Sequence, residues 1–318
     1  METVQLSTSN LTIGYPPDKI LFDQLNLSLR EGELVCFMGP NGIGKSTLIR
    51  TLAGIQQPLG GTINGSGSRQ VTVVLTDKIN AGNMTVNDLI SYGRYPYLDW
   101  NIRMTPQDMD MIHRAIQHVK IEDWLNKPLQ ELSDGQLQMV MIARALAQDT
   151  PVMILDEPTA HLDLNNRVEI MNLLRKLAHE HGKAVLVATH ELDLALQTAD
   201  LIWLATNEKS IGTGIPEDLV LDGTFDKVFQ FKGFDLRTGK VKHTPFRNVK
   251  VQLVGEGPTY LWTKNALERN GYEVLNNASA KVEIIQETKT KWQLSNEDGS
   301  FAYLSLQELL IGLKQSQD

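Results

Sequence analysis

The segment from Gly39 to Thr47 carries the residue types that hold a phosphate chain. It fits the pattern G-x-x-x-x-G-K-[ST], with an apolar strand before it and a helical stretch after it. Its glycines let backbone N–H groups turn inward around phosphates, and the helix start adds positive partial charge. Lys45 offers a charge to phosphate oxygens, and the Ser46 hydroxyl suits Mg²⁺. We therefore predict ATP binding, with Mg²⁺, by Gly39, Pro40, Asn41, Gly42, Ile43, Gly44, Lys45, Ser46 and Thr47.

Two adjacent carboxylates, Asp156 and Glu157, follow the apolar run from Pro151 to Leu155. The run has the pattern of a buried strand, and α/β proteins bind ligands at the carboxyl ends of such strands. Asp156 would hold the water shell of Mg²⁺, and Glu157 would polarise the attacking water. Alone, the two acids indicate only a solvated strand end. Together with the loop at Gly39 they predict ATP hydrolysis.

A third segment, Leu132-Ser133-Asp134-Gly135-Gln136, places a hydroxyl and a glycine at the start of a helical pattern. Such a start can bind an anion, or it can simply cap the helix. Taken by itself, the segment predicts a capped amphipathic helix.

Short apolar runs that alternate with helical patterns must position these residues. Strands are predicted at 34–38, 151–155, 184–189 and 201–205, after alternating segments at 4–13 and 20–29. This alternation predicts an α/β fold with a largely parallel sheet covered on both faces. Residues 85–150 read mostly as helix.

The pattern changes near residues 232–240, and the following residues read as a small α+β module. We expect strands at 249–254, 272–276, 281–286, 290–295 and 301–304, with helices at 258–270 and from 305. The predicted domains are therefore 1–235 and 241–318. The second domain could be a regulatory or ligand-sensing module, a dimerisation module or a structural extension, and we favour a dimer-stabilising extension.

Composition and charge bound the classes of function. The net charge is -8, and residues 241–318 hold nine basic and nine acidic side chains, so the acidic excess lies in residues 1–240. That balance argues against a general nucleic-acid binder. We expect no signal peptide, no membrane span and no intrachain disulfide, because Cys36 is the only cysteine.

In order and spacing, the motifs resemble those of ATP-binding cassette (ABC) ATPases over residues 1–225. The resemblance rests on the phosphate loop, Leu-Ser-Asp-Gly-Gln, Ile-Leu-Asp-Glu-Pro-Thr and Thr189-His190. It implies a P-loop cassette with a RecA-like mixed sheet core and a helical subdomain at about 85–150. The small α+β module would follow this cassette.

The resemblance also implies roles for single residues. Tyr15 would stack on adenine, although an ordinary turn tyrosine is the alternative, and His190 would touch the γ-phosphate. Asp163 would couple the two sites of a homodimer. The family signature corresponds to Ser133, Asp134, Gly135 and Gln136, which would contact ATP bound by the other subunit; this chain has Asp134 where the family has glycine. Lys45, Glu157 and His190 would be the catalytic residues.

One position departs from the family pattern. The family usually has glutamine after the strand at 71–75, where this chain has Thr76 and Asp77. Asp77 could order a Mg²⁺-bound water, and the position should face a membrane partner.

The stretch Asn83 to Tyr97 resembles the ATPases that serve iron–siderophore, haem and cobalamin permeases. The resemblance implies that Arg94, Tyr95 and Tyr97 contact the permease, whereas the alternative is an ordinary turn with core aromatics. We therefore expect a homodimeric ATPase, peripheral on the cytoplasmic face of the cell (inner) membrane. It would power import through a permease, to which a substrate-binding protein delivers the cargo. A soluble ABC ATPase without a permease, such as an iron–sulfur assembly ATPase, is the alternative.

Overall fold

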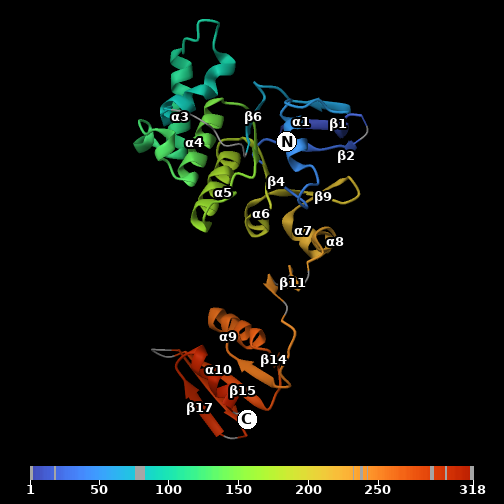
Figure 1. The fold of residues 1–318 in the computed structure, drawn as a ribbon, viewed down its shortest axis with the longest axis vertical. Helices are drawn as coiled ribbons and strands as arrows, with labels where there is room; N and C mark the ends of the chain where they lie inside the picture. The colour runs from blue at the N-terminus through green and yellow to red at the C-terminus, as the bar shows by residue number, and fades with distance from the viewer. Residues whose placement is uncertain are drawn as a thin grey trace. The chain divides into compact units, whose positions relative to one another are not determined.

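In the computed structural model of the chain, residues 3–17, 19–75, 83–231, 233–236, 239–241, 243–286, 290–297 and 299–315 are described. The chain forms two compact units that divide between Gln230 and Phe231 (Figure 1). Each unit has its own apolar core. No helix in the described ranges is long and apolar enough to cross a bilayer.

A six-stranded sheet forms the centre of the first unit, in the order β10-β9-β4-β8-β7-β6. All neighbours pair in parallel except β10, which is antiparallel to β9. The central strands β4, β7 and β8 are buried at every position, as expected for parallel strands covered on both faces. The strands are β4 (Leu34–Met38), β6 (Val71–Val74), β7 (Val152–Asp156), β8 (Ala184–Ala188), β9 (Leu201–Ala205) and β10 (Ile211–Gly214).

A second, antiparallel sheet carries the N-terminal part of the chain. In it, β1 (Val4–Tyr15) pairs with β2 (Lys19–Leu25), β3 (Ser28–Arg30) and β5 (Gly60–Asn64). The two sheets share one core, in which the ring of Phe37 lies 6.3 Å from that of Phe22 and 6.4 Å from that of Trp203.

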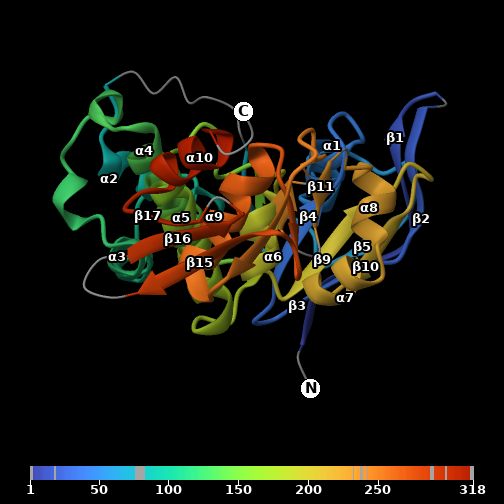
Figure 2. The same cartoon turned by 90° about the horizontal axis from the view of Figure 1, so that it is seen from below.

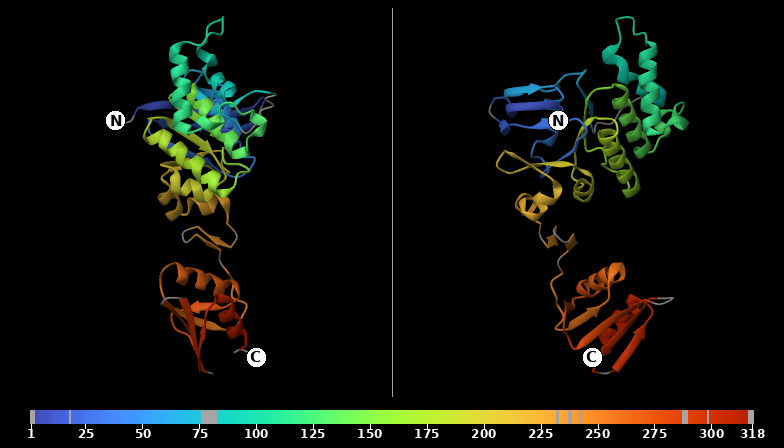
Figure 3. Two further views of the ribbon diagram at one scale, coloured as in Figure 1. Left: turned by 90° about the vertical axis from the view of Figure 1, so that its left-hand side faces the viewer. Right: turned by 180° about the vertical axis from the view of Figure 1, so that it is seen from behind.

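Helices pack on the six-stranded sheet and also form a separate group beside it (Figure 3). Those close to the sheet are α1 (Lys45–Leu52), α5 (Leu164–His179), α6 (Leu192–Thr198), α7 (Pro216–Leu221) and α8 (Thr224–Phe229). The separate group holds α2 (Val86–Ser91), η1 (Tyr92–Tyr97), α3 (Pro106–Val119), η2 (Glu122–Trp124), η3 (Leu129–Glu131) and α4 (Asp134–Ala147). Thr85, Thr105 and Ser133 begin three of these helices with reciprocal capping boxes.

The second unit contains a five-stranded sheet in the order β14-β13-β15-β16-β17. Two helices lie against this sheet (Figure 2), and a two-stranded ribbon precedes it. The elements are β11 (Phe234–Asp235), β12 (Lys240–Val241), β13 (Lys250–Val254), α9 (Gly257–Arg269), β14 (Glu273–Leu275), β15 (Ala280–Gln286), β16 (Thr290–Asn296), β17 (Gly299–Tyr303) and α10 (Leu306–Gln315).

The predicted fold class is confirmed: an α/β cassette with mixed sheets, followed by an α+β module. Several strands differ from the sequence expectations. The single strand predicted at 20–29 is divided into β2 and β3, and Gln24, with φ of 51°, lies near the break. The antiparallel strand β10 was not predicted, because Ile-Gly-Thr-Gly has little strand propensity.

Candidate active site

The phosphate loop connects the end of β4 to the start of α1. Gly44 precedes the helix with φ of 116°, and a Cβ there would lie 3.0 Å from the Leu21 side chain, so the position requires glycine. Lys45 is buried, and its Nζ donates to the carbonyl oxygens of Gly39 at 2.9 Å and Pro40 at 3.3 Å. The loop therefore holds this ammonium group inside its own curve.

The pKa of Lys45 is lowered because burial penalises the charged ammonium. The nearby carboxylates of Glu157 and Asp156 act in the opposite direction and only partly offset the burial. An anion bound at the loop would therefore provide a negative partner for this buried positive charge.

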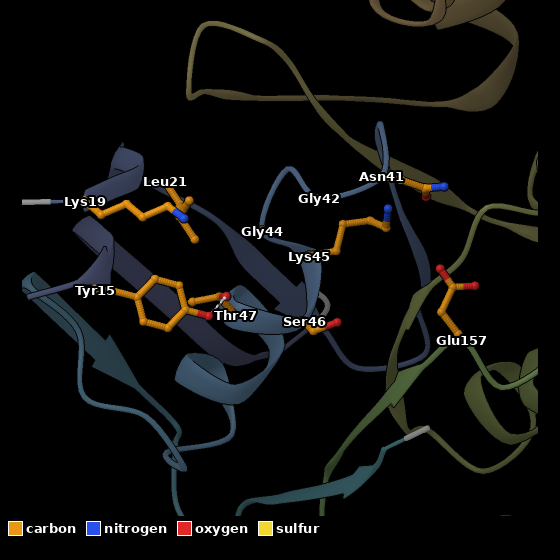
Figure 4. A pocket seen from close by; sticks show the side chains of 10 residues that line it. All are labelled: Tyr15, Lys19, Leu21, Asn41, Gly42, Gly44, Lys45, Ser46, Thr47 and Glu157. Carbon is orange, nitrogen blue, oxygen red and sulfur yellow. Dashed lines mark hydrogen bonds between the residues drawn. The ribbon is translucent and has the colours of Figure 1, made fainter. Parts of the chain in front are cut away.

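A cavity of about 470 Å³ opens beside the loop. Figure 4 shows Lys45 between Tyr15 on one side and Glu157 on the other. The Tyr15 hydroxyl lies 2.9 Å from Thr47 Oγ1, and 43% of this residue is exposed. The cavity is lined by Tyr15, Lys19, Leu21, Asn41, Gly42, Gly44, Lys45, Ser46, Thr47 and Glu157.

Lys19 and Leu21 enter this cavity although sequence reasoning did not name them. They come from β2, which pairs with β1 so that Tyr15 lies opposite Lys19. The Lys19 ammonium stands 5.9 Å from the centre of the Tyr15 ring. Strand pairing brings the two residues together, and the alternating pattern of this hairpin was the available signal.

The carboxylate of Glu157 stands at the tip of β7, next to buried Asp156. Glu157 has φ of 50°, a left-handed conformation that non-glycine residues adopt mainly where the surroundings impose it. Its N–H donates to the Ala188 carbonyl at 2.9 Å. Its Oε2 lies 2.5 Å from His190 Nδ1. The structure thus brings together two residues that are 33 positions apart.

A second cavity, of about 490 Å³, shares Asn41 and Glu157 with the first. Arg167 organises its wall, because its Nη1 lies 2.7 Å from Glu191 Oε1 and its Nε donates to the Leu162 carbonyl at 2.6 Å. Sequence reasoning missed Arg167 and Glu191, since their pairing joins α5 to the segment before α6. The cavity is lined by Asn41, Glu157, Ala160, His161, Arg167, His190 and Glu191.

The signature residues do not join these two cavities; in the described part of the chain, neither lining includes Ser133 to Gln136. The Ser133 hydroxyl accepts from Gln136 N at 3.3 Å, and Gln136 Oε1 accepts from Ser133 N at 3.1 Å. A Cβ on Gly135 would lie 2.9 Å from the Asn166 side chain. Asn166 in turn donates to both carboxylate oxygens of Asp163, at 2.9 and 3.0 Å. The segment from Ser133 to Gln136 and Asp163 thus form one surface cluster.

Arg94 lies inside the first unit rather than on its surface. Only 5% of the residue is exposed, its Nε lies 2.9 Å from Asp108 Oδ1, and its guanidinium carbon is 4.1 Å from the Tyr97 ring centre. Its donors are therefore directed inward, which does not fit direct contact with a partner. Tyr95 is 49% exposed and Tyr97 is half-buried, so a surface contact in this stretch is left to the tyrosines. The predicted position Asp77, with Thr76, lies outside the described residues.

Known proteins resemble both units of the chain. The family described as ABC transporter matches residues 22–160, and the iron ABC transporter C-terminal domain matches residues 248–314. An uncharacterised ABC transporter ATP-binding protein of Methanocaldococcus jannaschii is 36% identical over 285 residues, covering 85% of this chain and 98% of the relative.

The iron(3+)-hydroxamate import ATP-binding protein of Bacillus subtilis is 32% identical over 249 residues, covering 74% of this chain and 92% of the relative. A solved structure described as a metal-chelate type ABC transporter in an inward-facing conformation has a TM-score of 0.66 and 28% identity. That match covers 72% of this chain and 90% of the other.

Proposed function

This chain belongs to the ABC transporter ATP-binding proteins, and we propose that it powers import of an iron chelate or cobalamin through a membrane permease. As a member of this family of import ATP-binding subunits, it is an ATPase. The observation that carries the site assignment is the contact between Glu157 and His190 at the rim of the cavity that holds Lys45.

The chemistry follows from where the charges stand. Tyr15 offers a ring face to the adenine, and the loop amides with Lys45 bind the phosphates. Glu157 polarises a water for attack on the γ-phosphorus, and the bond to the β–γ bridging oxygen breaks to release ADP and phosphate. His190, 2.5 Å from Glu157, orients that carboxylate and would lie beside the γ-phosphate. Catalysis then comes mostly from positioning and charge stabilisation.

Ser46 and Asp156 are the residues that would hold Mg²⁺. A hydroxyl on the first turn of α1 and a buried carboxylate at the end of β7 are hard oxygen donors, the type that Mg²⁺ prefers. When bound, Mg²⁺ neutralises the charge that develops on the phosphate oxygens. Asp156 would act on its water shell.

Two copies of the chain complete each site. The cluster of Ser133, Gly135, Asn166 and Asp163 presents a capped helix start that lines neither of the two cavities described above. In a homodimer this helix start would face the γ-phosphate bound by the partner. ATP would then hold the two cassettes together, and hydrolysis would release them and move the permease between its access states.

The permease contact and the cargo are inferred from the relatives. Exposed Tyr95, with half-buried Tyr97 beside it, supports contact with a cytoplasmic helix of the permease. The chain would then be peripheral on the cytoplasmic face of the cell membrane. A substrate-binding protein would deliver the cargo from the opposite face. The hydroxamate-import relative supports an iron chelate.

Isolation of the native chain from detergent-solubilised membranes tests this function against a soluble iron–sulfur assembly ATPase. We expect a polytopic membrane protein to be recovered with it. ATP-dependent uptake of a ferric chelate or cobalamin into vesicles holding that complex should be lost in Glu157→Gln. Recovery of the chain only from the soluble fraction, with no polytopic partner, would contradict import.

A further inference from the structure

The sheet of the second unit has two edge strands that differ in character. One edge is β14, which has three residues and begins with the charged Glu273. The other is β17, which has five residues, contains no charge and no proline, and is followed by Leu304. Figure 1 shows β17 as the outermost strand on its side of the sheet. Natural proteins usually protect edge strands by keeping them short or by placing charged residues or proline in them, and β17 has neither a charged residue nor a proline.

Phe301, at the centre of β17, is only half covered. It pairs in register with Leu294 of β16, which is fully buried in the core of this unit. Phe301 therefore shares the core face of the sheet, yet 45% of it is exposed. Helix α10 approaches the other end of the strand, where a Cβ on Gly312 would lie 2.0 Å from the Tyr303 hydroxyl. The ring at the centre of the edge thus lacks the neighbour that a further strand would supply.

We propose that β17 pairs antiparallel with β17 of a second copy of this chain, with the two-fold axis at Phe301. In that register Ser300 lies opposite the second copy's Ala302, and the two Phe301 rings lie side by side on one face. Cross-strand aromatic pairs of this kind stabilise antiparallel sheets.

The edge itself favours a second copy over an unrelated chain. A partner chosen by charge would need a charged feature to recognise, and residues 299–304 offer none. An uncharged strand with an aromatic residue at its midpoint is complementary to itself, as a two-fold interface requires. The pairing goes beyond the proposed function, because it joins the second units and needs no nucleotide.

The state of association without nucleotide tests the proposal. The ATP-dependent contact between cassettes is then absent, so we expect the full chain to sediment as a dimer at micromolar concentration. Ala302→Lys, an exposed change on the opposite face of the strand, should weaken this dimer by about tenfold or more. Gln307→Lys, an exposed change on α10, should leave it unchanged and serves as the matched control. A dimer that Ala302→Lys does not weaken would overturn the proposed pairing.

A cysteine at the proposed axis gives an independent readout. Cys36 is the only native cysteine and is buried, so Phe301→Cys would carry the one accessible thiol. Directly opposed strand residues have a Cα separation that a disulfide can span. Under mild oxidant we expect linked dimers from Phe301→Cys, and few from the control Lys264→Cys on α9.

Two results together would overturn the edge pairing. One is that the chain stays a monomer without nucleotide at about 100 μM, a concentration at which many weak contacts with a Kd in the μM range are saturated. The other is that Phe301→Cys forms no more linked dimer than the control Lys264→Cys. Whether Glu157→Gln keeps bound ATP, measured in parallel, separates failure of the β17 pairing from failure of the proposed function. A chain that retains ATP but stays monomeric without it would contradict only the pairing of β17.

Discussion

Replacing Arg94 with alanine should destabilise the first unit strongly, although Arg94 lies outside the nucleotide site. The guanidinium donates to Asp108 at 2.9 Å and to the carbonyl oxygens of Ala147 at 3.1 Å and Gln148 at 3.4 Å. It therefore joins the start of α3 to the end of α4. Both side chains of the ion pair are only 6% exposed, so neither has much contact with bulk water.

Burial, rather than distance, sets the expected magnitude. Removing one partner of a buried ion pair costs about 3–5 kcal/mol, because the other charge stays buried and uncompensated. The pair of Arg114 and Asp110 is shorter, at 2.7 Å, but its side chains are 60% and 48% exposed. An exposed pair four residues apart on a helix contributes about 0.3–0.5 kcal/mol. At about 2–4 °C per kcal/mol for a unit of this size, Arg94→Ala should lower Tm by about 6–20 °C.

Thermal unfolding of Arg94→Ala, Arg114→Ala and the parent chain, followed by circular dichroism at neutral pH, measures the difference. We expect Arg114→Ala to lower Tm by less than about 2 °C, since it removes only the exposed pair. Replacing both Arg94 and Asp108 by apolar residues should recover part of the loss, because no unpaired charge is then buried. Equal small shifts for Arg94→Ala and Arg114→Ala would refute the reasoning.

Three further outcomes are expected. Gly93→Ala should lower the free energy of unfolding, measured with denaturant, by about 1–3 kcal/mol, because its Cβ would lie 2.3 Å from the Arg144 carbonyl oxygen in α4. In the control Gly212→Ala the new Cβ has no atom nearer than 4.0 Å, so this change should be nearly neutral. Burial, with the charge of Asp200, raises the pKa of Cys36 to about 12, so a thiol reagent at pH 8 should label it only after unfolding; labelling of the native chain would contradict this. Burial alone would raise the pKa of Asp108, but hydrogen bonds from Thr105 and Arg94 outweigh it and hold that pKa below its usual value. The stability that Asp108 contributes should therefore be present at neutral pH and lost as pH falls through the lowered pKa. The Tm values of Asp108→Asn and the parent chain should converge under acid. A difference in Tm that stays constant with pH would contradict this.

Much of the first unit could be predicted because its signals are local. Short apolar runs at 34–38, 151–155 and 184–189 have the pattern of buried parallel strands. The glycine at 44 marks a left-handed backbone, and Asp156 with Glu157 marks a strand end. Each of these features needs only neighbours in sequence.

What escaped prediction depends on contacts between distant segments. Arg94 looked like a surface residue, since a charged side chain is rarely buried unless partners satisfy it. Those partners, Asp108 and the carbonyls at the end of α4, lie 14 to 54 residues away. Arg167 and Glu191 likewise join through folding rather than through a motif. Weak strands such as β10 take their conformation from the neighbour they pair with.

Retention of ATP by the Glu157→Gln variant tests most directly whether each site is shared between two chains. Glu157→Gln should bind ATP, hydrolyse it about 10²–10⁴-fold more slowly, and keep about one ATP per chain through rapid desalting. Adding Ser133→Arg, which blocks the helix start expected to close over the partner's ATP, should leave equilibrium ATP binding intact but abolish retention. Equal retention with and without Ser133→Arg would show a site complete within one chain and would contradict the account.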